Sequence, residues 1–94
     1  MVKIEAAEGT DLAYTTDAAT AKAGQVSIEF TNPQSLSHDV AVEDSSGEEV
    51  GGTELVASGK TVATVGDLKP GKYTFFCTVP GHREAGMEGT LTVE

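Results

Sequence analysis

The sequence predicts an all-β fold, a Greek-key β-sandwich of two packed antiparallel sheets with about seven or eight strands. The 94 residues include eleven glycines and no tryptophan, and glycines spread along a chain are typical of many short strands joined by turns. In the clearest extended stretch, Val26, Ile28 and Phe30 fall on one face and polar residues on the other. Pro70-Gly71 followed by Tyr73 resembles a tyrosine corner, in which the hydroxyl bonds back to upstream backbone in Greek-key sandwiches.

The first third of the chain predicts three extended segments. Residues 2–7 alternate weakly and predict a strand, which is followed by a turn at residues 9–11 and a second extended piece over 12–16. Residues 17–23 are rich in alanine but end before Gly24, so a turn of helix and an irregular crossing loop are equally expected. A half-buried strand then begins near Val26 and stops at Asn32-Pro33.

The middle of the chain predicts one more strand and then a loop. Leu36, His38, Val40 and Val42 share one face of an alternating run, which indicates that His38 lies on the inward side next to the core. Residues 43–54 are acidic and rich in turn-forming residues, as expected for a solvated surface loop.

The last third predicts three strands. The first covers residues 62–65, and the second covers 73–79 and ends at Pro80-Gly81. The third covers 89–93 and directs Leu91 and Val93 inward. A chain of this length forms one core and not two, so residues 1–94 are expected to make one domain.

Composition excludes several classes of function. The net charge of −9 argues against nucleic acid as a partner, because phosphate binding relies on clustered Lys and Arg. No apolar run is long enough to insert into a membrane, and the amino terminus has no signal-peptide core, so either the chain is intracellular or a leader was removed. No Ser-His-Asp set, paired-acid pocket or phosphate loop is present, and we expect no enzymatic activity.

The chemistry is concentrated between Tyr73 and Met87. This stretch holds the single cysteine, Cys77, and places His82 and Met87 after it at equal steps. One Cys, two His and a weak axial Met are the ligands of mononuclear blue copper, and His38 is the only other histidine. The alternative is structural, because Cys is often a small buried hydrophobe, Met a gap filler and His a satisfied surface residue.

These motifs resemble those of the cupredoxins, the azurin, auracyanin and plastocyanin group. The resemblance rests on Cys77-Thr78-Val79-Pro80-Gly81-His82, on Gly86-Met87, and on His38-Asp39-Val40 upstream. It implies one type 1 copper ion held by His38, Cys77, His82 and Met87, which cycles between Cu(II) and Cu(I) in an electron carrier. It also implies a periplasmic or other extracytoplasmic location.

Two other functions remain open for the same site. The chain could be a cupredoxin domain from a larger copper enzyme such as a nitrite reductase or oxidase, or a copper storage or delivery protein. As an electron carrier it is expected to be a monomer that meets redox proteins with a basic surface. The acidic segment then has a second interpretation as a docking patch made by Glu43, Asp44, Glu48, Glu49 and Glu54.

The resemblance also implies roles around the ligands. The backbone N–H groups of Asp39 and Val79 would point at the Cys77 sulfur, and the Asp39 side chain at Thr78. Members of the family usually carry Asn at the position of Asp39, so the charge here is a departure. A small apolar surface around His82, through which a partner would reach the copper, is expected from Leu36, Pro80, Gly81 and Ala85.

Overall fold

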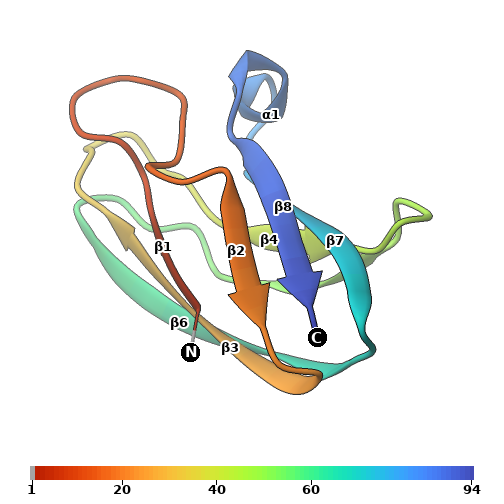
Figure 1. The fold of residues 1–94 in the computed structure, drawn as a ribbon. Coiled ribbons are helices and arrows are strands. Elements are labelled where there is room, and N and C mark those ends of the chain that lie inside the picture. The colour runs from red at the N-terminus through yellow and green to blue at the C-terminus, as the bar shows by residue number, and fades with distance from the viewer. Residues whose placement is uncertain (1) are drawn as a thin grey trace.

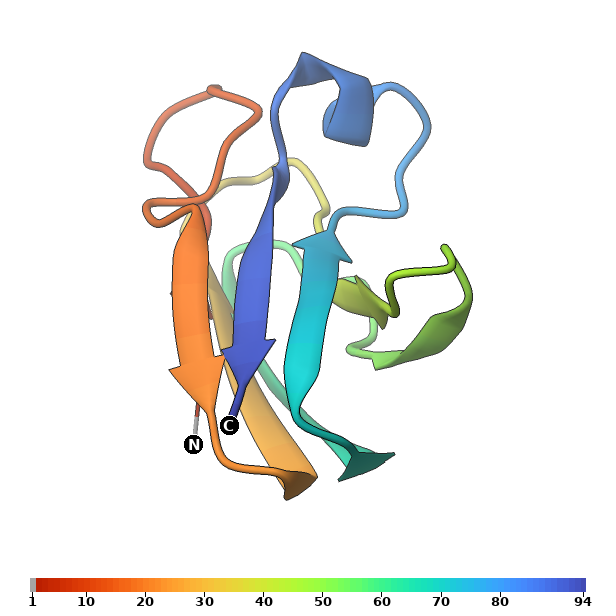
Figure 2. The ribbon, with the colours of Figure 1, turned by 45° about the vertical axis from the view of Figure 1, so that its right-hand side comes forward.

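The computed structural model describes residues 2–94 as two packed sheets with a short helix at one end (Figures 1 and 2). The smaller sheet has the order β1-β3-β6, from strands β1 (Val2–Glu5), β3 (Gly24–Asn32) and β6 (Gly59–Leu68). The larger sheet has the order β2-β8-β7-β4-β5, from strands β2 (Ala18–Ala21), β8 (Glu88–Val93), β7 (Gly71–Phe76), β4 (Ala41–Glu43) and β5 (Glu49–Gly52). The helix is α1 (His82–Ala85). The predicted all-β sandwich is confirmed.

The two sheets are not purely antiparallel as predicted. β1 pairs with β3, and β2 pairs with β8, in parallel. Between β1 and β3 the chain crosses to the other sheet, where it forms β2, and then returns. Parallel neighbours need such a crossover, and here β2 itself is part of it.

The core lies between the sheets and follows the predicted alternation. Val26, Ile28 and Phe30 of β3 are buried, and Leu91 and Val93 of β8 are buried opposite them. The predicted tyrosine corner is confirmed, because the Tyr73 hydroxyl donates to the Lys69 carbonyl at 2.9 Å and accepts from the Lys69 N–H at 3.1 Å.

The alanine-rich segment is a strand, so both predictions for residues 17–23 are wrong. Ala19 and Ala21 pair with Leu91 and Val93 of β8. The small alanine side chains fit against the core, and the pairing with β8 decides the conformation over the local helix propensity of alanine.

Three other predicted segments differ in extent. Residues 12–16 form no strand and contribute one isolated bridge, from Tyr14 to Ala6. The acidic segment is no simple loop, because β5 lies within it and pairs with β4, which ends at Glu43. β6 begins at Gly59 rather than at residue 62, since its antiparallel pairing runs along the whole of β3.

The predicted strand over residues 36–42 is short. Only Ala41–Glu43 is a strand, and His38 makes an isolated bridge with Val56. Leu36 is 47% exposed, so it does not share the inward face of His38, which is fully buried. The prediction for His38 is confirmed and that for Leu36 is wrong, because the chain turns before the bridge.

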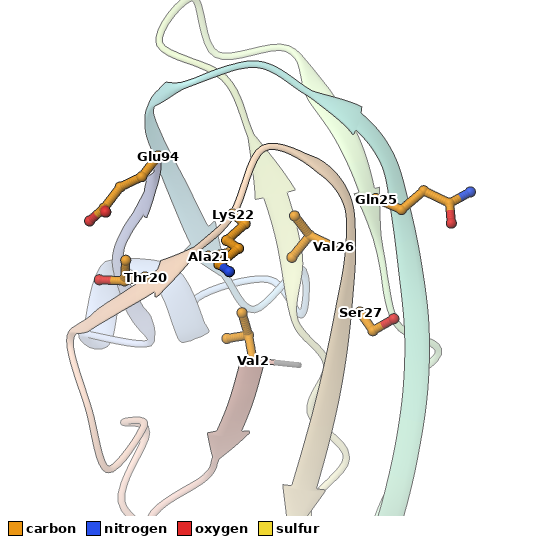
Figure 3. Close-up of a pocket in the computed structure, with 8 residues that line it drawn as sticks. All are labelled: Val2, Thr20, Ala21, Lys22, Gln25, Val26, Ser27 and Glu94. Atoms are coloured by element: carbon orange, nitrogen blue, oxygen red, sulfur yellow. The ribbon is translucent and has the colours of Figure 1, made fainter.

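The two ends of the sandwich differ. α1 and the loops that follow β1 and β3 lie at one end (Figure 1). The turns from β2 to β3 and from β6 to β7 lie at the other end, with the start of β1 and the end of β8. A pocket opens at this second end, where Val2 and Val26 face each other beside Lys22 and Glu94 (Figure 3). In residues 2–94 no helix is long and apolar enough to cross a membrane.

Candidate metal centre

Three of the four predicted ligands meet at the α1 end of the sandwich. The Nδ1 atoms of His38 and His82 are 3.1 Å apart. The Cys77 sulfur lies 3.5 Å from His82 Nδ1 and 3.9 Å from His38 Nδ1. All three side chains are buried, and they form a cluster that could hold a metal ion.

The spacing of these atoms fits one transition-metal ion. A triangle with sides of 3.1, 3.5 and 3.9 Å has a circumscribed circle whose centre lies about 2.0 Å from each corner. Zinc, a first-row metal, binds imidazole nitrogen at about 2.0–2.1 Å and thiolate at about 2.3 Å. A soft thiolate with two imidazoles is also the planar donor set of blue copper.

A closed loop brings Cys77, His82 and Met87 together. The Cys77 N–H donates to the Met87 carbonyl at 3.1 Å, and the Met87 N–H donates to the His82 carbonyl at 3.1 Å. Gly81 has φ of 85°, a left-handed conformation that favours glycine and turns the chain back into α1. Met87 is fully buried in the same core cluster as Cys77.

His38 reaches the cluster from a different part of the chain. Its backbone exchanges two hydrogen bonds with Val56, of 3.1 and 3.0 Å, which fixes the residue beside β6. Burial lowers the pKa of His38, and the nearby His82 lowers it further. A neutral ring with a free lone pair is the form that binds a metal.

The surroundings of Cys77 have opposing effects on its thiol. Burial raises the pKa of Cys77, whereas hydrogen bonds from the backbone N–H groups of Asp39 and Val79 lower it. These are the two donors that the sequence predicted. Burial has the larger effect, so the pKa of Cys77 is raised overall and the group remains a thiol. A metal ion must therefore displace the thiol proton to bind here.

Asp39 binds Thr78 as predicted. One carboxylate oxygen accepts the Thr78 N–H at 2.7 Å, and the other accepts the Thr78 hydroxyl at 2.5 Å. Its negative charge raises the pKa of Cys77. The carboxylate therefore both ties the His38 segment to the ligand loop and places a negative field at the sulfur.

Tyr14 supports the site, and sequence reasoning missed it. Its ring packs between Phe30 and Phe75, with centroids 6.0 and 5.4 Å away, and its hydroxyl donates to the Asp39 carbonyl at 2.6 Å. Burial, with the nearby Cys77 and Asp39, raises the pKa of Tyr14 far above its ordinary value. The hydroxyl therefore remains a donor.

Arg83 braces the ligand loop and was also missed. It follows His82 and pairs with Glu43 of β4 and with Glu88 of β8, the latter at 2.9 Å. Its guanidinium lies 4.2 Å from the centre of the Phe76 ring. Glu43 is thus held inside this network and is not a free member of the predicted docking patch.

The predicted apolar surface around His82 is exposed. Leu36, Pro80, Gly81 and Ala85 all face solvent, whereas His82 itself is 8% exposed. The role of this surface in docking stays a prediction.

Comparison with known proteins finds relatives among copper-binding proteins. A family model described as copper binding proteins, plastocyanin/azurin family, matches residues 1–94. Auracyanin-B of Chloroflexus aurantiacus is 67% identical over 24 residues, which are 26% of this chain and 10% of that protein. The match therefore spans a tenth of the length of this curated relative.

Solved structures show the same fold. Auracyanin A, described as a blue copper protein from Chloroflexus aurantiacus, has a TM-score of 0.84 and 21% identity over 99% of this chain and 97% of its own. A dithionite-reduced auracyanin from Roseiflexus castenholzii has a TM-score of 0.86 and 22% identity over 99% and 95%. Amicyanin from Paracoccus versutus has a TM-score of 0.67 and 24% identity over 99% and 80%.

Proposed function

The chain belongs to the plastocyanin/azurin family of copper-binding proteins, and we propose that it carries electrons through one type 1 copper site. His38 Nδ1, Cys77 Sγ and His82 Nδ1 are the strong ligands, and Met87 is the weak axial one. The observation that carries the proposal is the triangle of donor atoms, whose centre lies about 2.0 Å from each of them.

When bound, copper supplies a one-electron change between Cu(II) and Cu(I). The ligand residues are held in a rigid arrangement by the fold. His38 is anchored by its bridge to Val56, and the loop from Cys77 to Met87 is closed by backbone hydrogen bonds. Donors that are held by the fold in both oxidation states keep the reorganisation energy small, which suits an electron carrier.

Residues 1–94 act as one monomeric domain, without catalytic activity of their own, at an extracytoplasmic location. The partner is a redox protein with a basic surface, which complementary charge would steer toward the acidic hairpin. With Glu43 paired to Arg83, the remaining members of the predicted docking patch are Asp44, Glu48, Glu49 and Glu54.

Titration with Cu(II) tests the function directly. Addition of Cu(II) to the metal-free protein should produce an intense blue or green thiolate-to-copper absorption that saturates at one ion per chain. Cys77→Ser should lose the colour and keep the sandwich, because the core that carries the fold is aliphatic and aromatic. A colourless wild-type protein, or a blue Cys77→Ser variant, would contradict the proposal.

Redox cycling separates an electron carrier from a storage or delivery protein. Repeated reduction and reoxidation in the presence of a Cu(I) chelator should return the full absorbance each time. Loss of the ion to the chelator at each reduction would favour delivery instead.

A further inference from the structure

A buried glutamine connects His38 to the loop that follows β1. Gln34 is 3% exposed and lies between β3 and His38. Its side-chain Nε2 donates to the carbonyls of Ala7 and Asp11, at 2.7 and 2.8 Å. Its Oε1 lies 2.8 Å from Nε2 of the His38 ring. Each polar atom of the side chain therefore has a partner.

These partners allow one orientation of the amide. The carbonyls of Ala7 and Asp11 can only accept hydrogen bonds, so the NH₂ group of Gln34 must face them. A flipped amide would set its oxygen against two other oxygens in a buried place. The Oε1 atom is thereby directed at His38.

The amide orientation in turn determines the tautomer of His38. An amide oxygen can only accept, so the His38 Nε2 must carry the proton that it receives. In a neutral imidazole the other nitrogen then has a free lone pair. That nitrogen is Nδ1, which faces Cys77 and His82.

We propose that Gln34 is a positioning residue that holds His38 in its metal-binding tautomer and orientation. The carbonyls of Ala7 and Asp11 fix the orientation of the Gln34 amide, and the amide in turn fixes the His38 ring. The loop after β1, far from any ligand in sequence, is thus part of the scaffold of the metal site. This proposal rests on the copper site proposed above.

Asn32 braces the same turn from the other side. It is fully buried, and its Nδ2 donates to the carbonyls of Leu36 and Val56, at 2.8 and 2.6 Å. Its Oδ1 accepts the Gln34 N–H at 2.9 Å. The backbone of Gln34 is therefore fixed independently of its side chain, so a change of the side chain alone need not move the turn.

The wild-type protein offers a test without any variant. Long-range ¹H–¹⁵N spectra of the metal-free protein, at a pH where the rings are neutral, report which nitrogen of His38 carries the proton. We expect the Nε2–H tautomer, with that proton slow to exchange with water. An Nδ1–H tautomer, or a mixture of the two, would overturn the proposal.

Variants test the effect on metal binding. Gln34→Leu removes the acceptor, so His38 should populate both tautomers and the affinity for Cu(II) should fall roughly 10- to 100-fold, as for other partners of ligand histidines. Gln34→Glu keeps an acceptor for the ring but loses the NH₂ group that donates to the carbonyls of Ala7 and Asp11. It should therefore keep the Nε2–H tautomer and recover only part of the affinity.

Thr53→Val is the matched control. It removes the hydroxyl that accepts the Val40 N–H at 3.0 Å, two residues from His38, without touching the ring. It should lower stability but leave the tautomer and the affinity unchanged. Equal loss of affinity in Thr53→Val and Gln34→Leu, or wild-type affinity in Gln34→Leu, would overturn the role of Gln34. A wild-type protein that binds no copper would instead refute the proposed function, and the tautomer measurement would still decide the role of Gln34.

Discussion

Replacement of Asp39 by Asn should raise the reduction potential of the copper site. The carboxylate accepts two hydrogen bonds from Thr78. An Asn can keep both contacts, because its oxygen accepts the Thr78 N–H and its NH₂ donates to the Thr78 hydroxyl, whose own proton can rotate away. The substitution therefore removes a charge and preserves the shape and the link between the two segments.

The size of the shift in potential follows from the distance between the Asp39 charge and the Cys77 sulfur. The Asp39 oxygen is 2.7 Å from the Thr78 nitrogen, which is four bonds from the Cys77 sulfur, so the charge lies within about 8 Å of the sulfur. At an effective dielectric constant near 20, a unit charge at this distance contributes roughly 2 kcal/mol. For a one-electron couple that corresponds to a rise of up to roughly 100 mV.

Voltammetry of the copper-loaded protein measures the shift. Asp67→Asn is a matched control, because Asp67 is exposed, lies near the opposite end of the sandwich, and has φ of 55°, which Asn tolerates. The control should leave the potential almost unchanged. An unchanged or lowered potential in Asp39→Asn, with the visible spectrum intact, would refute the electrostatic reasoning and show that the Asp39 carboxyl group carries no effective charge at the site.

Three further predictions concern the surroundings of the ligands. Met87→Gln should still bind copper with a coloured thiolate site, but at a lower potential by voltammetry, because a harder oxygen favours Cu(II); an unchanged or raised potential would leave Met87 as a core residue only. Arg83→Met should lower the free energy of unfolding by about 1 kcal/mol at low salt and by less at high salt, since it removes two partly exposed ion pairs; denaturant titrations that show the same loss at both salt concentrations would exclude ion pairing as the cause. Tyr14 keeps its proton in the folded protein because its pKa is raised, whereas a tyrosine in the unfolded chain ionises near pH 10. The free energy of unfolding should therefore fall by up to about 1.4 kcal/mol per pH unit above pH 10. Tyr14→Phe should weaken this loss of stability between pH 8 and 11, and an equal loss in both proteins would contradict the raised pKa of Tyr14.

The ligands could be predicted from sequence because the chain offers few choices. One cysteine and two histidines leave a single way to complete a Cys-His-His set, and the ligand loop reads directly as a strand, a turn and a second strand. β3 and β8 could be predicted for a similar reason. Buried residues alternate along β3 from Val26 onward and at Leu91 and Val93 of β8, so the local pattern and the final packing agree.

The supporting residues could not be predicted, because their roles depend on contacts that leave no local pattern. The side chains of Tyr14, Gln34 and Arg83 reach partners 25, 27 and 40 residues away. These distant partners of Tyr14 and Gln34 are backbone carbonyls, which every residue possesses. β2 was missed for a related reason, since its conformation comes from pairing with β8 and not from its alanines.

The Nδ1 atoms of His38 and His82 are so close that a proton or a metal ion must lie between them. Their Nδ1 atoms are 3.1 Å apart, and two bare lone pairs at that distance repel. Since Gln34 keeps the proton of His38 on Nε2, the metal-free pair is satisfied only if His82 donates an Nδ1–H to His38. With a metal ion bound, the Nδ1 atom of His82 would give up that proton, and His82 would carry one on its outer nitrogen instead. The net proton released on loading then comes from Cys77, whose raised pKa keeps it a thiol beforehand. The same three donor atoms therefore hold a proton in the metal-free protein and a metal ion in the loaded protein. The two forms differ in the ionisation of the Cys77 thiol.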